Sequence, residues 1–238
     1  MNQCKNCHAE VSQHYCPNCG TPVALKRIDG HYILHELEHM IHFEKGLLYT
    51  IKELLLRPGQ SVKHFLVENR NRLVKPIVFL LIASLLYTLV SHYFHVEDGY
   101  VAYKEGKPTA TGQIFKWIQD HYGYANIIMG VFIAWWTKIF FRKYQYNYFE
   151  ILILLCFVMG MAMLIFAFFS ALEGLLHVPM MQVSSLLGIG YCTWAIAQFF
   201  DKGKAISYIK AFAAYMLGMI AFSLAAVAIG MVVDMVRG

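Results

Sequence analysis

Two pairs of cysteines near the start of the chain have the spacing of metal ligands. The pairs are "CKNC", with Cys4 and Cys7, and "CPNCG", with Cys16 and Cys19, and eight residues separate them. Two thiolates two residues apart can converge on one ion. Four soft thiolates in a tetrahedral arrangement select Zn²⁺ and leave no position open for water. The sequence therefore predicts a structural zinc site, a zinc ribbon, in residues 1–24.

Two alternatives to this ligand set stay open. The four cysteines would form two disulfides in an oxidising compartment, but the reducing cytosol that the membrane topology predicts disfavours them. His8 and His14 are competing donors, and either imidazole would replace a thiolate. So short a segment has almost no hydrophobic core. With either set of metal ligands, metal binding would supply the folding free energy of the segment and leave its surface for a partner.

A second motif with metal-ligand spacing is "HELEH", in which His35, Glu36 and His39 match the H-E-x-x-H pattern of zinc proteases. On a helix, the two histidines lie one turn apart and would hold the metal, while the glutamate would act as the general base. A protease also needs a third ligand and a substrate cleft. The carboxylates that follow before the first apolar run sit in no recognisable ligand motif: Glu44, Glu53 and Glu68.

The same histidines belong to a longer stripe. On a helix, His31, His35, His39 and His42 fall on the polar side, and apolar residues such as Leu37 lie opposite. The stripe has three interpretations: a catalytic zinc site, a second metal site or pH-responsive face without catalysis, and a solvated or interfacial helix face. The third needs no further ligand, and we favour it.

The elements that position these motifs divide near Lys75. The chain of 238 residues is 58% hydrophobic and only 15% charged, and its apolar residues concentrate after that point. Its mean hydropathy of +0.47 is not that of a soluble globule. A helix that crosses a bilayer needs about 20 apolar residues. The sequence thus predicts an all-α integral membrane protein with five transmembrane helices in residues 76–238: Ile77–Phe94, Ala125–Phe141, Ile151–Leu172, Val178–Phe200 and Ala211–Val233.

The distribution of lysine and arginine predicts the orientation. Ten of these residues precede the first apolar run, and the loop "LEGLLHVP" between the third and fourth runs has none. Further cations lie at the end of the second run and directly after it, Lys138, Arg142 and Lys143, and between the fourth and fifth runs, Lys202, Lys204 and Lys210. Cytoplasmic loops are the basic ones. We expect a multi-pass protein of the bacterial inner membrane, with the N-terminus in the cytoplasm and the C-terminus outside. This topology accounts for most of the net charge of +5, so we expect no nucleic acid as a partner.

Residues 25–75 connect the ribbon to the first apolar run. Their second half has a helix-like apolar pattern interrupted at Pro58 and Gly59. It predicts amphipathic interfacial helices on the cytoplasmic leaflet, with their cations near anionic lipids. Packing of the same helices against the cytoplasmic ends of the bundle is compatible with that prediction. The apolar residues are Leu48, Ile51, Leu54 and Leu55, then Val62, Phe65, Leu66 and Leu73.

The stretch "HFEKGLLYTIKELLLRPGQSVKHFLVENRNRLVKPIVFLL", together with the two cysteine pairs, resembles a bacterial family known as domain of unknown function 3667. The resemblance covers Cys4 to about Leu89, and "LLYTIKELLLRPG" is its most specific part. Many members have glycine-lysine-arginine where this chain has residues 68–72, so only the arginine character carries over. The family implies an N-terminal ribbon followed by several membrane spans. More distantly, the topology is similar to the Yip-type five-span membrane proteins, and neither resemblance implies an activity.

The apolar runs contain few groups that do chemistry. Glu173 and Asp234 are expected near the outer interface, and Cys156 and Cys192 are expected as core residues. Small residues predict close helix approach or an oligomer interface: Gly160, Ala162, Gly218, Ala221, Ala225 and Gly230.

These observations favour a non-enzymatic membrane adaptor or scaffold whose zinc ribbon engages a cytoplasmic protein partner, with a homo-oligomer as the other expected assembly. One alternative is a membrane-tethered zinc protease that uses His35, Glu36 and His39. The other is a lipid or small-molecule transporter or a channel.

Overall fold

A computed structural model describes residues 2–4, 7, 9–11, 14–20, 46–94 and 109–237 of the chain. The histidine stripe, His31 to His42, lies outside the described residues, as does His8. The predictions made for them stay predictions.

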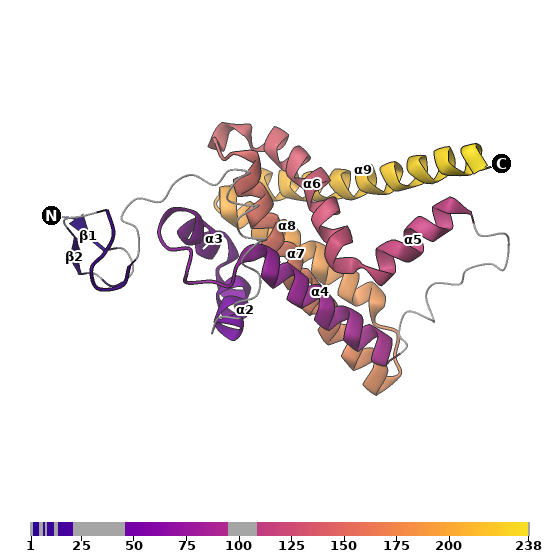
Figure 1. Cartoon of the computed structure of the whole chain (residues 1–238), viewed down its shortest axis with the longest axis horizontal. Coiled ribbons are helices and arrows are strands. Elements are labelled where there is room, and N and C mark those ends of the chain that lie inside the picture. Colours follow the sequence, from indigo (N-terminus) through magenta and orange to yellow (C-terminus); the bar gives the residue numbers. More distant parts are fainter. Residues whose placement is uncertain are drawn as a thin grey trace.

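The described chain is helical apart from a small two-stranded sheet at its start (Figure 1). The sheet pairs β1 (Asn2–Gln3) with β2 (Glu10–Val11) in antiparallel register. The helices that follow are α2 (Leu47–Leu56), α3 (Pro58–Val67), α4 (Pro76–Tyr93), α5 (Ala110–Asp120), α6 (Tyr122–Phe140), the 3₁₀ turn η2 (Arg142–Tyr144), α7 (Tyr148–Leu176), α8 (Met181–Phe200) and α9 (Ala205–Arg237). The predicted all-α membrane region is therefore shown.

Four of these helices are long and apolar enough to cross a membrane: α4, α7, α8 and α9. They correspond to the first, third, fourth and fifth predicted runs. The second predicted run also forms a helix, α6, which has 19 residues. It is not among the four, because Asn126, Lys138 and its tyrosines and tryptophans lower its hydropathy. The structure thus shows four candidate membrane spans, and a fifth is a matter of proposal.

Helix α7 lies at the centre of the bundle and packs against α4, α6 and α8. Its sequence is almost continuously apolar, and 72% of its most apolar stretch is buried by the other helices. A capping box begins the helix, since the Asn147 side chain accepts the Glu150 amide and the Glu150 carboxylate accepts the Asn147 amide. Burial on all sides explains why no amphipathic pattern marks this helix in the sequence.

The predicted close approach of helices is confirmed at three glycines. A Cβ atom at Gly160 would lie 2.7 Å from the Phe79 ring, and one at Gly218 would lie 2.5 Å from the Ile133 backbone. At Gly230 it would lie 2.3 Å from the Thr111 hydroxyl. These glycines therefore set the distances between α7 and α4, between α9 and α6, and between α9 and α5.

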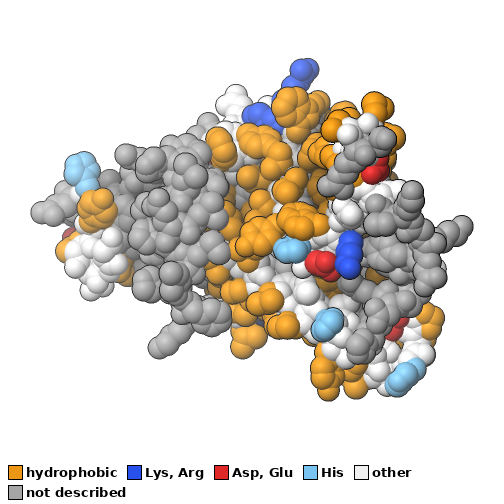
Figure 2. Space-filling view, turned by 45° about the vertical axis from the view of Figure 1, so that its right-hand side comes forward, with side chains coloured by type: hydrophobic (Ala, Val, Ile, Leu, Met, Phe, Trp, Pro, Cys, Tyr) orange, Lys and Arg blue, Asp and Glu red, His pale blue; other side chains and the backbone are white. Residues whose placement is uncertain are grey.

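Apolar side chains also cover much of the outside of the bundle. Figure 2 shows them gathered over the middle of one face, with few charged side chains among them. Such a surface fits contact with lipid rather than water. Exposed members of this surface include Leu85, Leu89, Leu186, Leu224 and Ile229.

One helix was not predicted. No element was assigned to the residues between the first two predicted runs, Ile77–Phe94 and Ala125–Phe141, but α5 lies between them and packs along α9. Thr109 caps α5 by accepting the Gly112 amide, and the Ala110 amide donates to Asp234 on α9 at 2.7 Å. The helix is short and amphipathic, so it depends on the apolar flank of α9, which the local sequence does not reveal.

Candidate functional site

The four predicted cysteine ligands come together in the structure. The sulfur atoms of Cys4, Cys7, Cys16 and Cys19 all lie within 4.8 Å of one another. Two of the Sγ–Sγ distances, Cys4 to Cys19 and Cys7 to Cys16, are 3.5 Å. Tetrahedral zinc with Zn–S bonds of about 2.3 Å places its sulfurs about 3.8 Å apart, so the cluster has the size of one such site. The cluster does not include His14, which lies within the described residues.

Both cysteine pairs sit in tight backbone turns. The Cys4 amide donates to the Ala9 carbonyl and the Gly20 amide to the Cys16 carbonyl, each at 2.8 Å. Gly20 has φ +68°, a left-handed conformation that glycine adopts without strain and that follows the second pair directly. The glycine of "CPNCG" therefore shapes the turn that brings Cys16 and Cys19 to the same side.

The disulfide alternative does not match this geometry. None of the six cysteines, all of which lie within the described residues, forms a disulfide, and 3.5 Å is far longer than the about 2.05 Å of a sulfur–sulfur bond. Desolvation by burial, together with the neighbouring Cys7 and Cys19 thiols, raises the pKa of Cys16 to about 11, although the amides of Cys19 and Asn18 oppose the rise. A bound divalent cation would lower the pKa of Cys16 instead, because it stabilises the thiolate form. The residues present thus fit a metal ion, and the four cysteines would hold it.

The helices α2 and α3 form a hairpin, residues 47–67, that docks on the bundle. α2 ends at Leu56 and Pro58 begins α3, with Arg57 alone between them, so the predicted break in the apolar pattern is confirmed. Gly59 lies against the last turn of α8, where an added Cβ would be 2.3 Å from the backbone of Gln198. Tyr191 of α8 donates to the carbonyl of Leu54 at 2.9 Å. The hairpin is therefore held to α8 by backbone contact and by a hydrogen bond.

The predicted apolar residues of the hairpin divide into two groups. Leu54 and Phe65 are completely or almost completely buried, and the Phe65 ring meets that of Phe157 on α7 edge to face at 5.3 Å. Leu48 and Leu55, by contrast, are 83% and 50% exposed. The hairpin therefore packs on the bundle and still presents leucines outward, as an interfacial helix does. Val62 and Leu66 join the buried group, as does Leu73, which follows the hairpin, and Ile51 is half-buried.

Three segments that were predicted to share one side of the membrane meet at the hairpin end of the bundle. The Phe141 and Phe200 rings stack at 4.0 Å, which joins the α6–α7 connection to the end of α8. Tyr144 donates to Asp201 at 3.3 Å across the same junction. The ammonium group of Lys63 lies 5.7 Å from the centre of the Phe199 ring and links α3 to this junction. The arrangement agrees with the charge pattern, because all three segments are basic.

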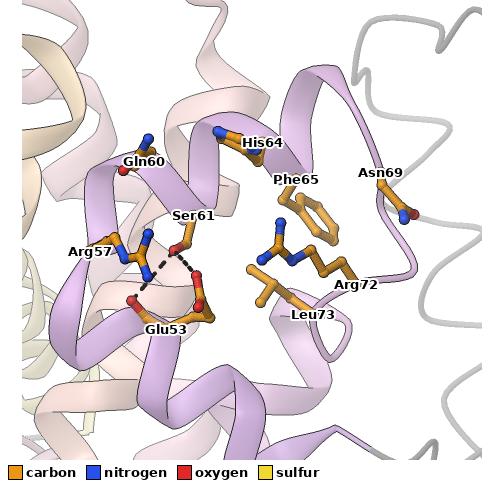
Figure 3. Close-up of a pocket in the computed structure, with 9 residues that line it drawn as sticks. All are labelled: Glu53, Arg57, Gln60, Ser61, His64, Phe65, Asn69, Arg72 and Leu73. Carbon is orange, nitrogen blue, oxygen red and sulfur yellow. Dashed lines mark hydrogen bonds between the residues drawn. The ribbon is translucent and has the colours of Figure 1, made fainter. Parts of the chain in front are cut away.

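The hairpin also contains a small polar pocket that sequence patterns did not indicate. It measures about 60 Å³. Figure 3 shows Arg57 and Arg72 approaching it from opposite sides, with Ser61 and Glu53 between them. Ser61 donates to the Glu53 carboxylate at 3.1 Å, and Arg72 donates through Nε to the Tyr49 hydroxyl. Glu53 is the carboxylate of the lining, and the two guanidinium groups carry its positive charge. Such a pair suits a phosphate or carboxylate group of matching size.

One comparison with known proteins matches this segment of the chain. Residues 44–88 match the family described as "Protein of unknown function (DUF3667)", which confirms the resemblance to that family. The matched residues cover α2, α3 and most of α4, the docked hairpin and its exit into the membrane. No curated protein and no solved structure matches this chain.

Proposed function

We propose that this chain is a non-enzymatic adaptor of the bacterial inner membrane whose zinc ribbon engages a cytoplasmic protein partner. The observation that carries the proposal is the closed set of four cysteines ahead of an apolar helical bundle. Four thiolates occupy every position of a tetrahedral zinc, so the metal would fold the ribbon and would not bind a substrate. The ribbon also presents an aromatic side chain, Tyr15, which is 65% exposed.

The adaptor would cross the membrane five times, with α6 as the additional span. Three contacts support this: α6 packs against α4, α7 and α9. Ile133 and Ala134 of α6 are fully buried in the bundle. A reporter fused after Gly238 should be exported and one placed before Met1 should stay cytoplasmic. If both reporters were cytoplasmic, the chain would have an even number of spans and α6 would lie outside the hydrocarbon core.

The hairpin would anchor the cytoplasmic end to anionic lipids. Its segment is basic, and the pocket between Arg57 and Arg72 would accept a lipid phosphate. Replacing both arginines by glutamine should lower the amount of phosphatidylglycerol that copurifies in mild detergent. Lys116→Gln on α5, an exposed cation at the far end of the bundle, is the matched control. Equal retention by the two variants would remove the pocket from the proposal.

Photo-crosslinking tests the adaptor itself. A photoreactive amino acid at position 15 of the full chain, in its own membrane, should form a discrete protein adduct. The same amino acid at position 135 is a matched control, because Trp135 is also 65% exposed but lies on α6, where lipid is the expected neighbour. Cys16→Ser should abolish the adduct at position 15 and leave the control unchanged. An adduct that persists without the metal, or none at all, would contradict a zinc-dependent adaptor.

Metal content separates the adaptor from the protease alternative. The purified chain should contain one zinc per molecule. Glu36→Gln should leave metal content and cellular function unchanged, because on a solvated helix face that charge contributes little. Two zincs per chain, together with loss of function in this one variant, would replace the adaptor by a membrane-tethered protease that uses His35, Glu36 and His39.

A further inference from the structure

A second pocket lies at the end of the bundle opposite the hairpin. It measures about 200 Å³ and is formed by the C-terminal halves of α4 and α7 and the first turns of α6 and α8. On α8 it is lined by Met181, Ser184 and Ser185, whereas the hairpin contacts the same helix at Tyr191 and Gln198. At 1.5 Å per residue, Ser185 lies about 9 Å from Tyr191 and about 20 Å from Gln198 along α8, and the pocket shares no lining residue with the arginine pocket. The pocket is thus independent of both the cysteine cluster and the arginine pocket.

Aromatic rings form adjoining walls of this pocket. Tyr87 and Tyr122 meet at 5.0 Å between ring centres with an angle of 66° between the planes. Tyr87 and Phe166 meet at 6.1 Å and 61°. Steep angles place the rings as walls of a corner rather than as a flat stack. A corner of this kind offers more than one ring face to a group that enters it.

The charge of the lining is negative. Glu173, on the last turn of α7, is its one carboxylate, and no lysine or arginine is among the described residues that line it. One carboxylate oxygen accepts the Met180 amide at 2.9 Å, which fixes the side chain between α7 and α8. Hydroxyl groups of Ser170, Ser184 and Ser185 complete the polar part of the lining. The site therefore favours a cation over an anion.

Polar groups beside the pocket also lack partners. The Ser84 hydroxyl and the Asn126 amide nitrogen are buried and have no hydrogen-bond partner within the part of the chain that the structure describes. They lie one helical turn along the chain from Tyr87 and Tyr122, respectively, but are not among the residues that line the pocket. A buried polar group without a partner costs free energy, so a bound water beside the pocket would stabilise them.

We infer that this pocket binds the ammonium group of an organic cation, with Glu173 as the counter-charge and the rings of Tyr87, Tyr122 and Phe166 as the cage. A hard metal ion fits less well, because it requires about six oxygen ligands and the lining supplies one carboxylate. An organic ammonium group gains both from a carboxylate and from ring faces. The volume suits a small amine or the amine-bearing headgroup of a lipid.

Titration calorimetry on the full chain tests this inference. Tetramethylammonium and ethanolammonium chloride are titrated into protein in phosphatidylglycerol nanodiscs, against equal sodium chloride. Binding should be measurable and should weaken by at least about tenfold in Glu173→Gln, because the charge-assisted contact is lost while the amide oxygen still accepts the Met180 amide. Asp120→Asn removes an exposed carboxylate from α5 and should bind as the wild type does.

A second pair of variants tests the cage. Tyr122→Leu should weaken binding severalfold, while Tyr124→Leu, two residues later and 60% exposed, should not. Nanodiscs that contain phosphatidylethanolamine identify the source of the amine. If phosphatidylethanolamine is the ligand, it should suppress binding of the soluble cations and copurify with wild type but not with Glu173→Gln. If a free amine is the ligand, the soluble cations should bind equally well in phosphatidylethanolamine and phosphatidylglycerol nanodiscs.

Either lipid result supports the inference. It is overturned if neither cation binds in phosphatidylglycerol nanodiscs and phosphatidylethanolamine is not retained, which would mean a pocket filled by water. It is also overturned if Glu173→Gln and Asp120→Asn behave alike.

Discussion

The ribbon and the docked hairpin differ in what holds them in place. The buried core of the ribbon, within the described residues, consists of Cys4, Val11 and Cys16. The hairpin shares a continuous core with the bundle, in which Phe65, Phe79 and Phe157 are almost wholly buried. The ribbon therefore depends on the ion that its thiolates bind, whereas the hairpin depends on apolar contact and on close backbone approach. Changes to the metal ligands and changes to the packing should act separately.

Cys16→Ser should have the largest effect. Metal binding supplies about 10–16 kcal/mol in zinc-finger peptides, and a ribbon with so small a core cannot replace it. We expect loss of zinc and of amide protection in residues 2–20, with the bundle still folded. Metal analysis and hydrogen exchange on the purified chain measure both results.

Cys156→Ser is the matched control for this change. Cys156 is buried on α7 and takes no part in the cluster, so its replacement should leave the zinc in place. The comparison between ribbon and hairpin would fail if Cys16→Ser unfolded the bundle as well, or if the ribbon kept its amide protection after chelation.

Gly59→Ala should have the next largest effect, on the hairpin alone. The added methyl group would meet backbone atoms of Gln198 and Phe199, which cannot rotate away, at 2.3 to 2.4 Å. Overpacking costs about 1–3 kcal/mol, and a contact with backbone belongs at the upper end. We expect faster proteolysis within residues 47–67 and unchanged zinc content. Limited proteolysis in nanodiscs measures the first of these.

Gly190→Ala is the control for the glycine change. Gly190 lies in the middle of α8 with open space around its Cα, so alanine there should be neutral or stabilise the helix by about 1 kcal/mol. Equal proteolysis of the two glycine variants would show that close contact with α8 does not hold the hairpin.

Tyr191→Phe should weaken the same attachment by less. The lost hydroxyl leaves the Leu54 carbonyl without its donor, which costs about 1–3 kcal/mol when the group stays dry and less when water reaches it. The midpoint of thermal unfolding should fall. Tyr208→Phe removes an exposed hydrogen bond to the Lys202 carbonyl and should change that midpoint less. A larger fall of the midpoint in Tyr208→Phe than in Tyr191→Phe would contradict the proposed attachment of the hairpin to α8.

Asp201→Asn should have the smallest effect, and it should depend on pH. The hydrogen bond from Lys204 holds the pKa of Asp201 below its ordinary value of 3.8, and the Gly203 amide acts in the same direction. A lowered pKa stabilises the fold at pH above the unfolded value, and this stabilisation disappears as pH falls through the folded value. The variant should therefore be less stable than wild type at about pH 7 and equal to it in strong acid. If the difference in stability between wild type and variant grew as the pH fell, the pKa of Asp201 would be raised in the folded state and not lowered.

The sequence predicted some of these features because their signals are local. Cysteine spacing and long apolar runs require no knowledge of distant contacts, and both the cysteine cluster and four apolar spans are found. The aromatic pocket was missed because Tyr87, Tyr122 and Glu173 belong to three different helices and carry no joint motif. The exposure of Leu48 and Leu55 was equally hidden, because the amphipathic pattern does not say which leucines the bundle covers.

The length of α9 has a consequence for the membrane itself. Its 33 residues extend about 50 Å, whereas a bilayer has a hydrocarbon core of about 30 Å. Only 17% of its apolar stretch is buried by the other helices, so most of this stretch faces outward from the bundle. A span this long meets hydrophobic mismatch, which is relieved by inclination of the helix or by local thickening of the bilayer. In Figure 1 the distal part of α9 runs away from the ends of α4 and α7 and lies beside α5. The Asp234 carboxylate of α9 accepts a hydrogen bond from the first residue of α5, Ala110. Bilayer thickness should therefore set the inclination of α9 and, through that bond, the position of α5.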